Sequence, residues 1–155
     1  MTIMSEPKHF IVIGNGPAGN QAALTLKEKI PSARVTIISA ERDCCYRPNM
    51  LPEYIAGTTS RENLWITPYS AYRPLGIDLR RGQRVVLVDP KEKMLVLDHR
   101  EEIRFDGLVI TTGGTPGLPE WFLIYRNLVY TLKTLQDANR WRKRLQKVNS
   151  VLVLG

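Results

Sequence analysis

The chain has 155 residues, 43% of them hydrophobic, which suffices for one buried core but is too short for two full α/β domains. No apolar run approaches the roughly 20 residues of a membrane span, and the amino-terminal residues lack the pattern of a secretory signal, so we expect a cytoplasmic protein that does not enter a membrane. The net charge of +7 favours an anionic cofactor or an acidic partner. Nucleic acid is not expected, because the basic residues of 140–147 belong to the solvated face of a predicted helix.

A glycine-rich turn near the amino terminus is the most informative motif. Residues 10–13 form an apolar run that predicts a strand, and 14–19 read Gly-Asn-Gly-Pro-Ala-Gly before a helix-forming segment. In this pattern Gly14 permits the tight turn, Gly16 lets the backbone approach a pyrophosphate, and Gly19 lets the helix pack closely on the strand. Three glycines can also be ordinary turn residues, and the segments that follow decide between the two interpretations.

The following segments complete a strand-helix-strand unit. Residues 21–29 carry helix formers with apolar residues at helical spacing, a Pro-Ser pair ends that helix, and 35–38 predict a buried strand. Glu41 comes soon afterwards, close to the distance of about 20 residues from the glycines at which an acidic residue binds ribose hydroxyls. A carboxylate suits a ribose without a 2′-phosphate. The alternative is a solvated surface carboxylate, because the tightest spacing would place the acid at Ser39.

A loop of changed composition follows the second predicted strand. Residues 44–67 are rich in Arg, Pro, Asn, Gly and Thr, with one or two helical turns expected among them. The loop leaves the carboxyl edge of the strand, where doubly wound sheets bind their ligands. Cys44 and Cys45 are adjacent and therefore too close for an ordinary disulfide. They are either small inert loop residues or a redox pair, and no metal site is expected.

The middle of the chain predicts a short helix and then strands. Thr67 is expected to cap a helix that starts at Pro68 and ends at Arg73. The strands expected after it are 76–79, 85–88, 94–97 and 108–110. Residues 89–93 are expected to join two of these strands in a hairpin. The expected fold class is therefore α/β: a Rossmann-like domain with a parallel sheet and a small antiparallel β excursion.

The carboxyl-terminal segment holds a predicted basic helix and a final apolar run. The buried face of the helix is expected to carry Leu132, Leu135, Ala138, Leu145 and Val148. Residues 150–155 repeat the start of the first strand and its glycine. We expect one domain over 1–150 and, over 151–155, the start of a second, truncated dinucleotide-binding motif; the alternative is a last core strand. An unpaired strand here would favour self-association into a homo-oligomer.

Four segments resemble the amino-terminal FAD-binding domain of the pyridine nucleotide-disulfide oxidoreductase superfamily, and most closely its NADH:rubredoxin reductase and nitrite reductase type. Residues 35–41 are similar to the second strand and its ribose-binding acid, and 46–57 to the loop beside the flavin. Residues 105–116 resemble the family's Ala-Thr-Gly motif, with Thr111 in place of the alanine. Residues 132–138 resemble the linker and helix that lead into the NAD(P)H domain.

The resemblance implies a set of FAD contacts around the glycine-rich turn. The adenosine ribose would contact Glu41, and adenine would lie beside Arg42 and the backbone of Val85. The flavin half would lie near Arg47 and the turn at 112–113. The implied cofactor-binding residues are Gly14, Gly16, Pro17, Ala18, Gly19, Glu41, Arg42, Arg47, Val85, Thr112 and Gly113. The alternatives are a solvated Arg47, a core Val85 and an ordinary turn, and no catalytic side chain is expected because the flavin carries the chemistry.

The chain also departs from the family's pattern. No Cys-x-x-x-x-Cys pair follows the glycine-rich turn, and the reactive cysteine of single-cysteine relatives would fall near Asn49, which is no nucleophile. The family's nicotinamide-binding domain and its later FAD-contacting segment are missing. The expected function is the FAD-binding portion of an NAD(P)H-dependent flavin oxidoreductase that passes electrons to a redox protein, a metal centre or a small oxidant. NAD(P)H would bind only in a longer protein. The alternatives are a module that holds FAD or an adenine nucleotide without turnover and a remnant that self-associates.

Overall fold

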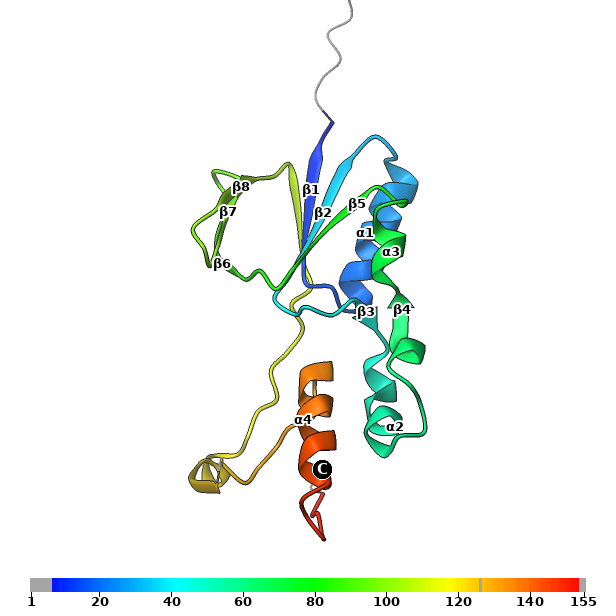
Figure 1. The fold of residues 1–155 in the computed structure, drawn as a ribbon. Helices are drawn as coiled ribbons and strands as arrows, with labels where there is room; N and C mark the ends of the chain where they lie inside the picture. The colour runs from blue at the N-terminus through cyan, green and yellow to red at the C-terminus, as the bar shows by residue number, and fades with distance from the viewer. Residues whose placement is uncertain (1–6, 126, 154–155) are drawn as a thin grey trace, which may run out of the picture. The chain divides into compact units, whose positions relative to one another are not determined.

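The computed structural model describes residues 7–125 and 127–153, which fold as two compact units. The first unit comprises the chain up to Tyr46 together with Ile66–Gly113. The second comprises Arg47–Trp65 and the chain from Gly114 onward. The ribbon of Figure 1 shows the elements of both units. No helix of the described residues is long and apolar enough to cross a membrane.

A four-stranded parallel sheet forms the centre of the first unit. Its strands, in spatial order, are β5 (Ile77–Arg81), β2 (Arg34–Ser39), β1 (His9–Ile13) and β9 (Gly107–Ile110). In the register of the sheet, Val12 lies between Ile37 on β2 and Val109 on β9. The helix α1 (Pro17–Lys29) connects β1 to β2, as the sequence predicted. The α/β class with a parallel sheet is therefore confirmed, and all carboxyl ends of these strands meet at one edge.

The two faces of this sheet are covered by different elements (Figure 1). Alternate residues of a strand point to opposite faces, so Val12 and Ile37 pack with Ala23 of α1 and with Tyr72. On the other face, Ile11, Ile13 and Ile38 pack with residues of a second, antiparallel sheet. β1 is buried on both faces, which explains why its sequence is a continuous apolar run.

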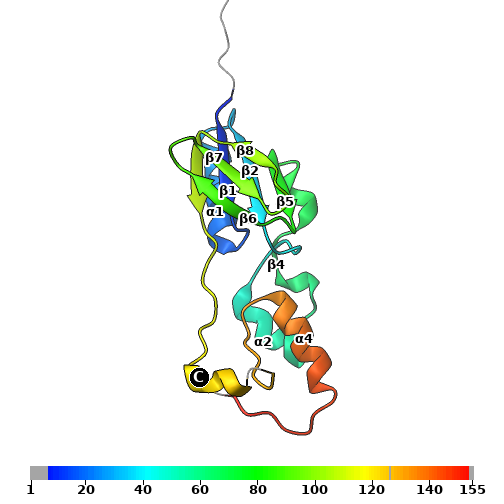
Figure 2. The ribbon, with the colours of Figure 1, turned by 90° about the vertical axis from the view of Figure 1, so that its left-hand side faces the viewer.

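The antiparallel sheet contains β6 (Val85–Asp89), β7 (Met94–Leu97) and β8 (Glu102–Arg104), and Figure 2 views it face on. The hairpin expected between the first two of these strands is confirmed by their antiparallel pairing, in which Asp89 lies opposite Met94. Leu95 and Leu97 are fully buried and close the second core. The sequence did not predict β8, because Ile103 is its one apolar residue between charged neighbours.

The segment 67–73 differs from the expectation. Thr67 ends the strand β4 (Trp65–Thr67), which pairs with β3 (Cys45–Tyr46), and the helix α3 covers only Tyr69–Tyr72. The N-cap of α3 is Pro68, so the prediction of a Thr67 cap was wrong. The physical reason is that the Thr67 hydroxyl is buried and accepts a hydrogen bond from Asn20 Nδ2 at 3.0 Å.

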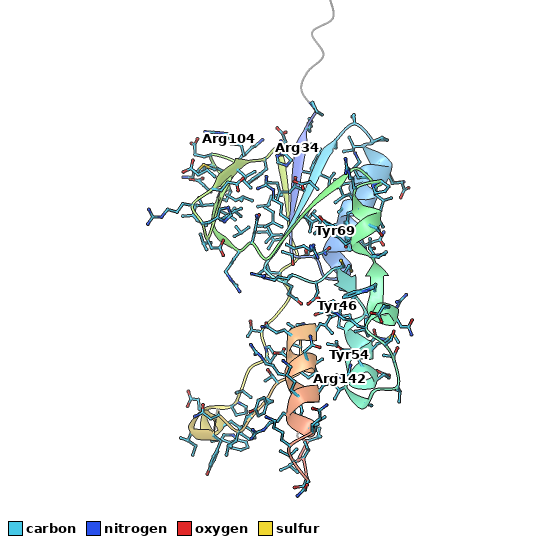
Figure 3. The ribbon with its side chains drawn as sticks, in the orientation of Figure 1. Arg34, Tyr46, Tyr54, Tyr69, Arg104 and Arg142 are labelled. Atoms are coloured by element: carbon cyan, nitrogen blue, oxygen red, sulfur yellow. The ribbon has the colours of Figure 1, made fainter. Side chains whose placement is uncertain are left out.

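The second unit is built from short helices. They are η1 (Pro48–Met50), α2 (Leu51–Ala56), η2 (Glu62–Leu64), η3 (Glu120–Tyr125) and α4 (Leu135–Leu145). α4 begins with a capping box, in which Asp137 N–H donates to Thr134 Oγ1 at 3.1 Å. α2 packs against α4: Tyr54 Oη donates to Asn139 Oδ1 at 2.8 Å, and the Arg142 guanidinium lies 4.5 Å from the Tyr54 ring (Figure 3).

The carboxyl-terminal expectations hold only in part. Leu135 and Ala138 are buried as predicted, and Leu145 is half-buried, but Leu132 is exposed and precedes the helix. Residues 150–153 form no strand, so the alternative of a last core strand was wrong over this range. Leu154 and Gly155 lie outside the described residues. The domain limits of 1–150 and 151–155 stay a prediction.

A histidine ties the start of β1 to neighbouring strands. His9 Nδ1–H donates to the Arg104 carbonyl oxygen at 3.0 Å, and His9 Nε2 lies 3.0 Å from the Thr36 hydroxyl. Burial, reinforced by the nearby Arg34 charge, lowers the pKa of His9 below its ordinary value of 6.5. His9 therefore takes up its proton at a lower pH in the folded chain than in the unfolded chain, where it does so near pH 6.5.

This lowered pKa makes a prediction about stability. The contribution of His9 is present above about pH 6.5 and is lost as pH falls from there through the folded-state pKa, because the unfolded state binds more protons in that window. We expect the free energy of unfolding, measured with urea at pH 7.5 and 5.5, to fall less in His9→Gln than in the parent. The chain has one other histidine, His99. Its pKa is raised because its ring nitrogens donate hydrogen bonds to the carboxylates of Glu101 and Asp98. His99→Gln is the control, because its effect has the opposite sign; equal slopes for His9→Gln and the parent would contradict the prediction.

Candidate functional site

The glycine-rich turn leads from β1 into α1 at the carboxyl edge of the parallel sheet. Gly14 has φ of +104°, a conformation that favours glycine, and its N–H donates to the Ile38 carbonyl oxygen at 2.8 Å. A Cβ at Gly14 would also collide with the carbonyl of Thr111. A Cβ at Gly19 would collide with the Gly14 carbonyl oxygen. These two glycines therefore serve the close packing that the sequence pattern predicts.

Gly16 differs from the other two, because a Cβ placed on it would meet nothing within 4 Å. Gly16 is the N-cap of α1, and Pro17 occupies the first helical position. Among the described residues no side chain caps this helix, and its first turn holds no acidic residue. The first intrahelical bond runs from Asn20 N–H to Gly16 O at 2.9 Å, so the N–H groups of Ala18 and Gly19 precede the helical ladder.

The space beside Gly16 is open to an anionic group. Backbone N–H groups and the positive end of the helix dipole both favour anionic oxygens at this position. A side chain at Gly16 would occupy the open space from which such a group would approach. The open space is compatible with a pyrophosphate at the second glycine of the pattern, and that contact stays a prediction.

Glu41 lies just beyond the carboxyl end of β2, on the same edge of the sheet. Tyr46 Oη donates to Glu41 Oε2 at 2.9 Å, and Glu41 N–H donates to the Ser39 hydroxyl at 3.2 Å. The Glu41 carbonyl oxygen accepts from Gly82 N–H at 3.1 Å. A carboxylate has about four acceptor positions, so its bond from Tyr46 is compatible with further bonds from ribose hydroxyls.

Arg42 is exposed beside this carboxylate. Its carbonyl oxygen accepts a hydrogen bond from the Arg81 guanidinium at 3.0 Å, and its side-chain stem lies beside Gly82. The Arg81 guanidinium in turn lies 4.0 Å from the ring of Tyr69, which Figure 3 labels. The Arg42 backbone is therefore held at the ends of β2 and β5 by groups of the first unit.

Val85 begins β6 and is half-buried against the second core. Gln83, two residues earlier, donates its N–H to the Ser39 carbonyl oxygen at 3.0 Å, which brings this segment to the end of β2. Gln83 Oε1 is buried and has no hydrogen-bond partner among the described residues. A buried acceptor next to the Glu41 segment is consistent with a ligand donor there.

Thr112 and Gly113 lie one residue beyond the end of β9 and are exposed. Gly113 has φ of +70°, and a Cβ on it would meet nothing within 4 Å. The preceding Thr111 donates its N–H to the Ile13 carbonyl oxygen at 2.8 Å. The first unit therefore brings the 112–113 turn next to the glycine-rich turn, although 98 positions separate Thr111 from Ile13.

Arg47 belongs to the second unit and is not placed with the other predicted residues. Its guanidinium donates to the carbonyl oxygens of Trp65 at 2.8 Å and Asn63 at 3.2 Å. The side chain thus holds the turn around η2, which the sequence did not indicate. A contact between Arg47 and the flavin stays a prediction.

Sequence reasoning missed a buried polar cluster beneath the glycine-rich turn. Tyr72 Oη lies 3.2 Å from Asn15 Oδ1 and 3.0 Å from Asn20 Oδ1, and it accepts from Cys45 N–H at 3.4 Å. Burial raises the pKa of Tyr72, which keeps the hydroxyl protonated. Asn15 Nδ2 is buried without a partner among the described residues. No pattern signals this cluster, because its members come from distant segments.

Both cysteines are buried and neither forms a disulfide. Cys45 lies in β3 with no exposed surface, and Cys44 precedes it. Reactive cysteines are usually partly exposed, so burial favours the interpretation of both as small structural residues over the interpretation as a redox pair. Among the described residues, no group of three or more His, Cys, Asp or Glu side chains is arranged to hold a metal ion.

The sheet order, the open glycine-rich turn and the acid after β2 are those of a Rossmann-like α/β domain. The sequence matches the pyridine nucleotide-disulphide oxidoreductase family over residues 8–155. The chain belongs to this family. FAD and NAD(P)H are cofactors that fit the family. The resemblance derived from the sequence motifs is thereby confirmed.

Individual relatives are known from sequence and structure. The chain is 31% identical over 148 residues to the ferredoxin–NAD(+) reductase component of the 3-phenylpropionate/cinnamic acid dioxygenase of Photorhabdus laumondii, covering 94% of this chain and 37% of the relative. An NAD-dependent persulfide reductase from A. fulgidus is similar with a TM-score of 0.82 and 26% identity, over 90% of this chain and 27% of that one. An NADH:rubredoxin oxidoreductase from Clostridium acetobutylicum shares the fold, with a TM-score of 0.75 and 23% identity. The match covers 90% of this chain and 36% of that one. The chain thus spans about a third of the length of the relatives it matches.

Proposed function

We propose that the chain is the FAD-binding portion of an NAD(P)H-dependent flavin oxidoreductase that passes electrons to a redox protein. The observation that carries the proposal is the open N-terminus of α1 at Gly16, which lies on the same sheet edge as Glu41 in a member of this family. FAD needs both a site for its pyrophosphate and an acceptor for its ribose hydroxyls. The first unit supplies candidates for both.

Each predicted residue has a specific role in this proposal. The N–H groups at Gly16, Ala18 and Gly19 hold the pyrophosphate oxygens, and Glu41 accepts from the adenosine ribose. Arg42 and Val85 flank the adenine. The turn at 112–113 contacts the flavin half through backbone groups. Bound FAD would supply the carrier that accepts electrons from nicotinamide and passes them on.

The class of electron acceptor comes from the relatives. The Photorhabdus protein is a ferredoxin–NAD(+) reductase component, and another relative, from Pseudomonas putida, is a putidaredoxin reductase. These names support a small redox protein as the acceptor, in preference to a metal centre or a small oxidant. The whole reaction would need nicotinamide binding as well, which we assign to a longer protein.

The proposal is tested with the visible spectrum of the chain. Purified protein is mixed with FAD, separated from free flavin by gel filtration, and treated anaerobically with NADH and then dithionite. We expect co-eluting flavin bands that persist with NADH and bleach with dithionite. A colourless protein after gel filtration would overturn FAD binding. Bleaching by NADH would overturn the assignment of nicotinamide binding to a longer protein.

The role of Glu41 makes a separate prediction. Glu41→Gln removes the charge but keeps the shape, so FAD affinity should fall by about ten- to a hundredfold, as for hydrogen bonds to a charged group of about 1.5–3 kcal/mol. The measurement is a fluorescence titration of FAD. Glu102→Gln, which changes an exposed carboxylate on β8, is the matched control. An unchanged affinity in Glu41→Gln would leave Glu41 a surface residue held by Tyr46.

A further inference from the structure

Thr111 is the first residue after β9 and faces the glycine-rich turn. Its hydroxyl lies 2.9 Å from the Ile13 carbonyl oxygen and 3.2 Å from the Gly14 carbonyl oxygen. Its N–H already donates to the same Ile13 oxygen at 2.8 Å. The single hydroxyl proton is shared between these two carbonyl oxygens, so one residue from the other end of the unit contacts two successive carbonyl groups of the turn.

The hydroxyl occupies the room that two glycines leave. A Cβ on Gly19 would come within 2.5 Å of Thr111 Oγ1, and a Cβ on Gly14 within 3.1 Å of it. The Thr111 hydroxyl oxygen thus lies between the first and third glycines of the turn, in space that a side chain on either glycine would fill. On the other side, Gly14 N–H is held by the Ile38 carbonyl oxygen at 2.8 Å. The Gly14 peptide groups are fixed from both neighbouring strands.

Fixing these peptide groups matters because glycine has more backbone freedom than any other residue. The Gly14 carbonyl shares one rigid peptide plane with the N–H of Asn15, so its orientation fixes the direction in which the chain continues toward Gly16. A turn that is already ordered loses less entropy when an anion binds. A hydroxyl that holds Gly14 therefore preorganises the N–H groups on the open side at Gly16.

We propose that Thr111 is a positioning residue, whose hydroxyl holds the Gly14 carbonyl so that the turn is preformed for a pyrophosphate. The inference rests on the proposed function and deepens it, because it assigns anion affinity to a side chain that does not touch the cofactor. It predicts that loss of the hydroxyl weakens the binding of ligands that contain a pyrophosphate and leaves the binding of ligands without one unchanged.

The test uses three variants of the full chain and three ligands. Thr111→Val keeps the shape without the hydroxyl, Thr111→Ala removes both, and Thr111→Ser keeps the hydroxyl. For Val and Ala we expect FAD and ADP to bind about three- to tenfold more weakly, as for one neutral hydrogen bond. Adenosine, followed by NMR, should bind all forms alike, and Thr111→Ser should stay within about twofold of the parent.

A spectroscopic signature accompanies the affinities. The ³¹P resonances of bound FAD should shift in Thr111→Val and stay at the parent's positions in Thr111→Ser. Equal ADP affinity in the parent and Thr111→Val, or an equal loss for adenosine, would overturn the inference. So would variants that fail to fold without the hydroxyl, because Thr111 would then serve the fold alone. If the parent itself binds neither FAD nor ADP, the proposed function fails instead.

Discussion

Gly16→Val should abolish measurable FAD binding while the chain stays folded. The valine side chain would fill the open space beside the α1 N-terminus, where a Cβ meets nothing within 4 Å. Gly16 has φ of −73° and ψ of 179°, an extended conformation that valine adopts without strain. The loss of two charge-assisted hydrogen bonds, at about 1.5–3 kcal/mol each, lowers affinity by more than about a hundredfold.

The measurement is a fluorescence titration of FAD, with circular dichroism to show that the variant is folded. Gly117→Val is the matched control, since a Cβ at that glycine also meets nothing within 4 Å and no function is assigned to it. The control should bind FAD like the parent. A folded Gly16→Val protein with the parent's affinity would mean that the pyrophosphate does not lie on this turn.

Gly19→Ala should instead damage the fold. The new methyl group would collide with the Gly14 carbonyl oxygen and lie 2.5 Å from Thr111 Oγ1, so α1 must move away from β1. We expect the free energy of unfolding to fall by about 1–3 kcal/mol, the usual cost of overpacking, despite the helix propensity of alanine.

Urea unfolding of Gly19→Ala beside Gly16→Ala measures this effect. The second variant adds the same methyl group where nothing opposes it, so its stability should fall by less than about 1 kcal/mol, the cost of alanine in place of glycine at an N-cap. Equal stabilities for the two variants would contradict the close packing of the third glycine. The pair thus separates the glycine that packs from the glycine that faces the ligand.

The sequence predicted the parts of the fold that local patterns determine. The run before Gly14 is apolar because β1 is buried on both faces, and the glycine-rich turn follows at the strand's end. The prediction of a Thr67 cap was wrong because the Thr67 hydroxyl is hydrogen-bonded to Asn20, a residue distant in the sequence. The alternative of a last core strand over 150–153 was wrong because hydrophobicity alone does not supply a strand with which to pair.

The candidate site was predictable to a similar extent. Motif spacing indicated the glycines and Glu41, whereas Arg42, Val85 and the 112–113 turn depended on the family resemblance. The polar cluster at Tyr72 was not predictable, because 57 positions separate it from Asn15 and 52 from Asn20. Contacts at such separations arise only when the sheet assembles.

The most direct test of the pyrophosphate site is an NMR titration of the ¹⁵N-labelled chain with ADP and with FAD. We expect both ligands to shift the amide resonances of Gly14, Gly16, Ala18 and Gly19 most strongly, together with those of the Glu41 segment. Absence of shifts at these amides, or shifts confined to other segments, would contradict a pyrophosphate site on the glycine-rich turn.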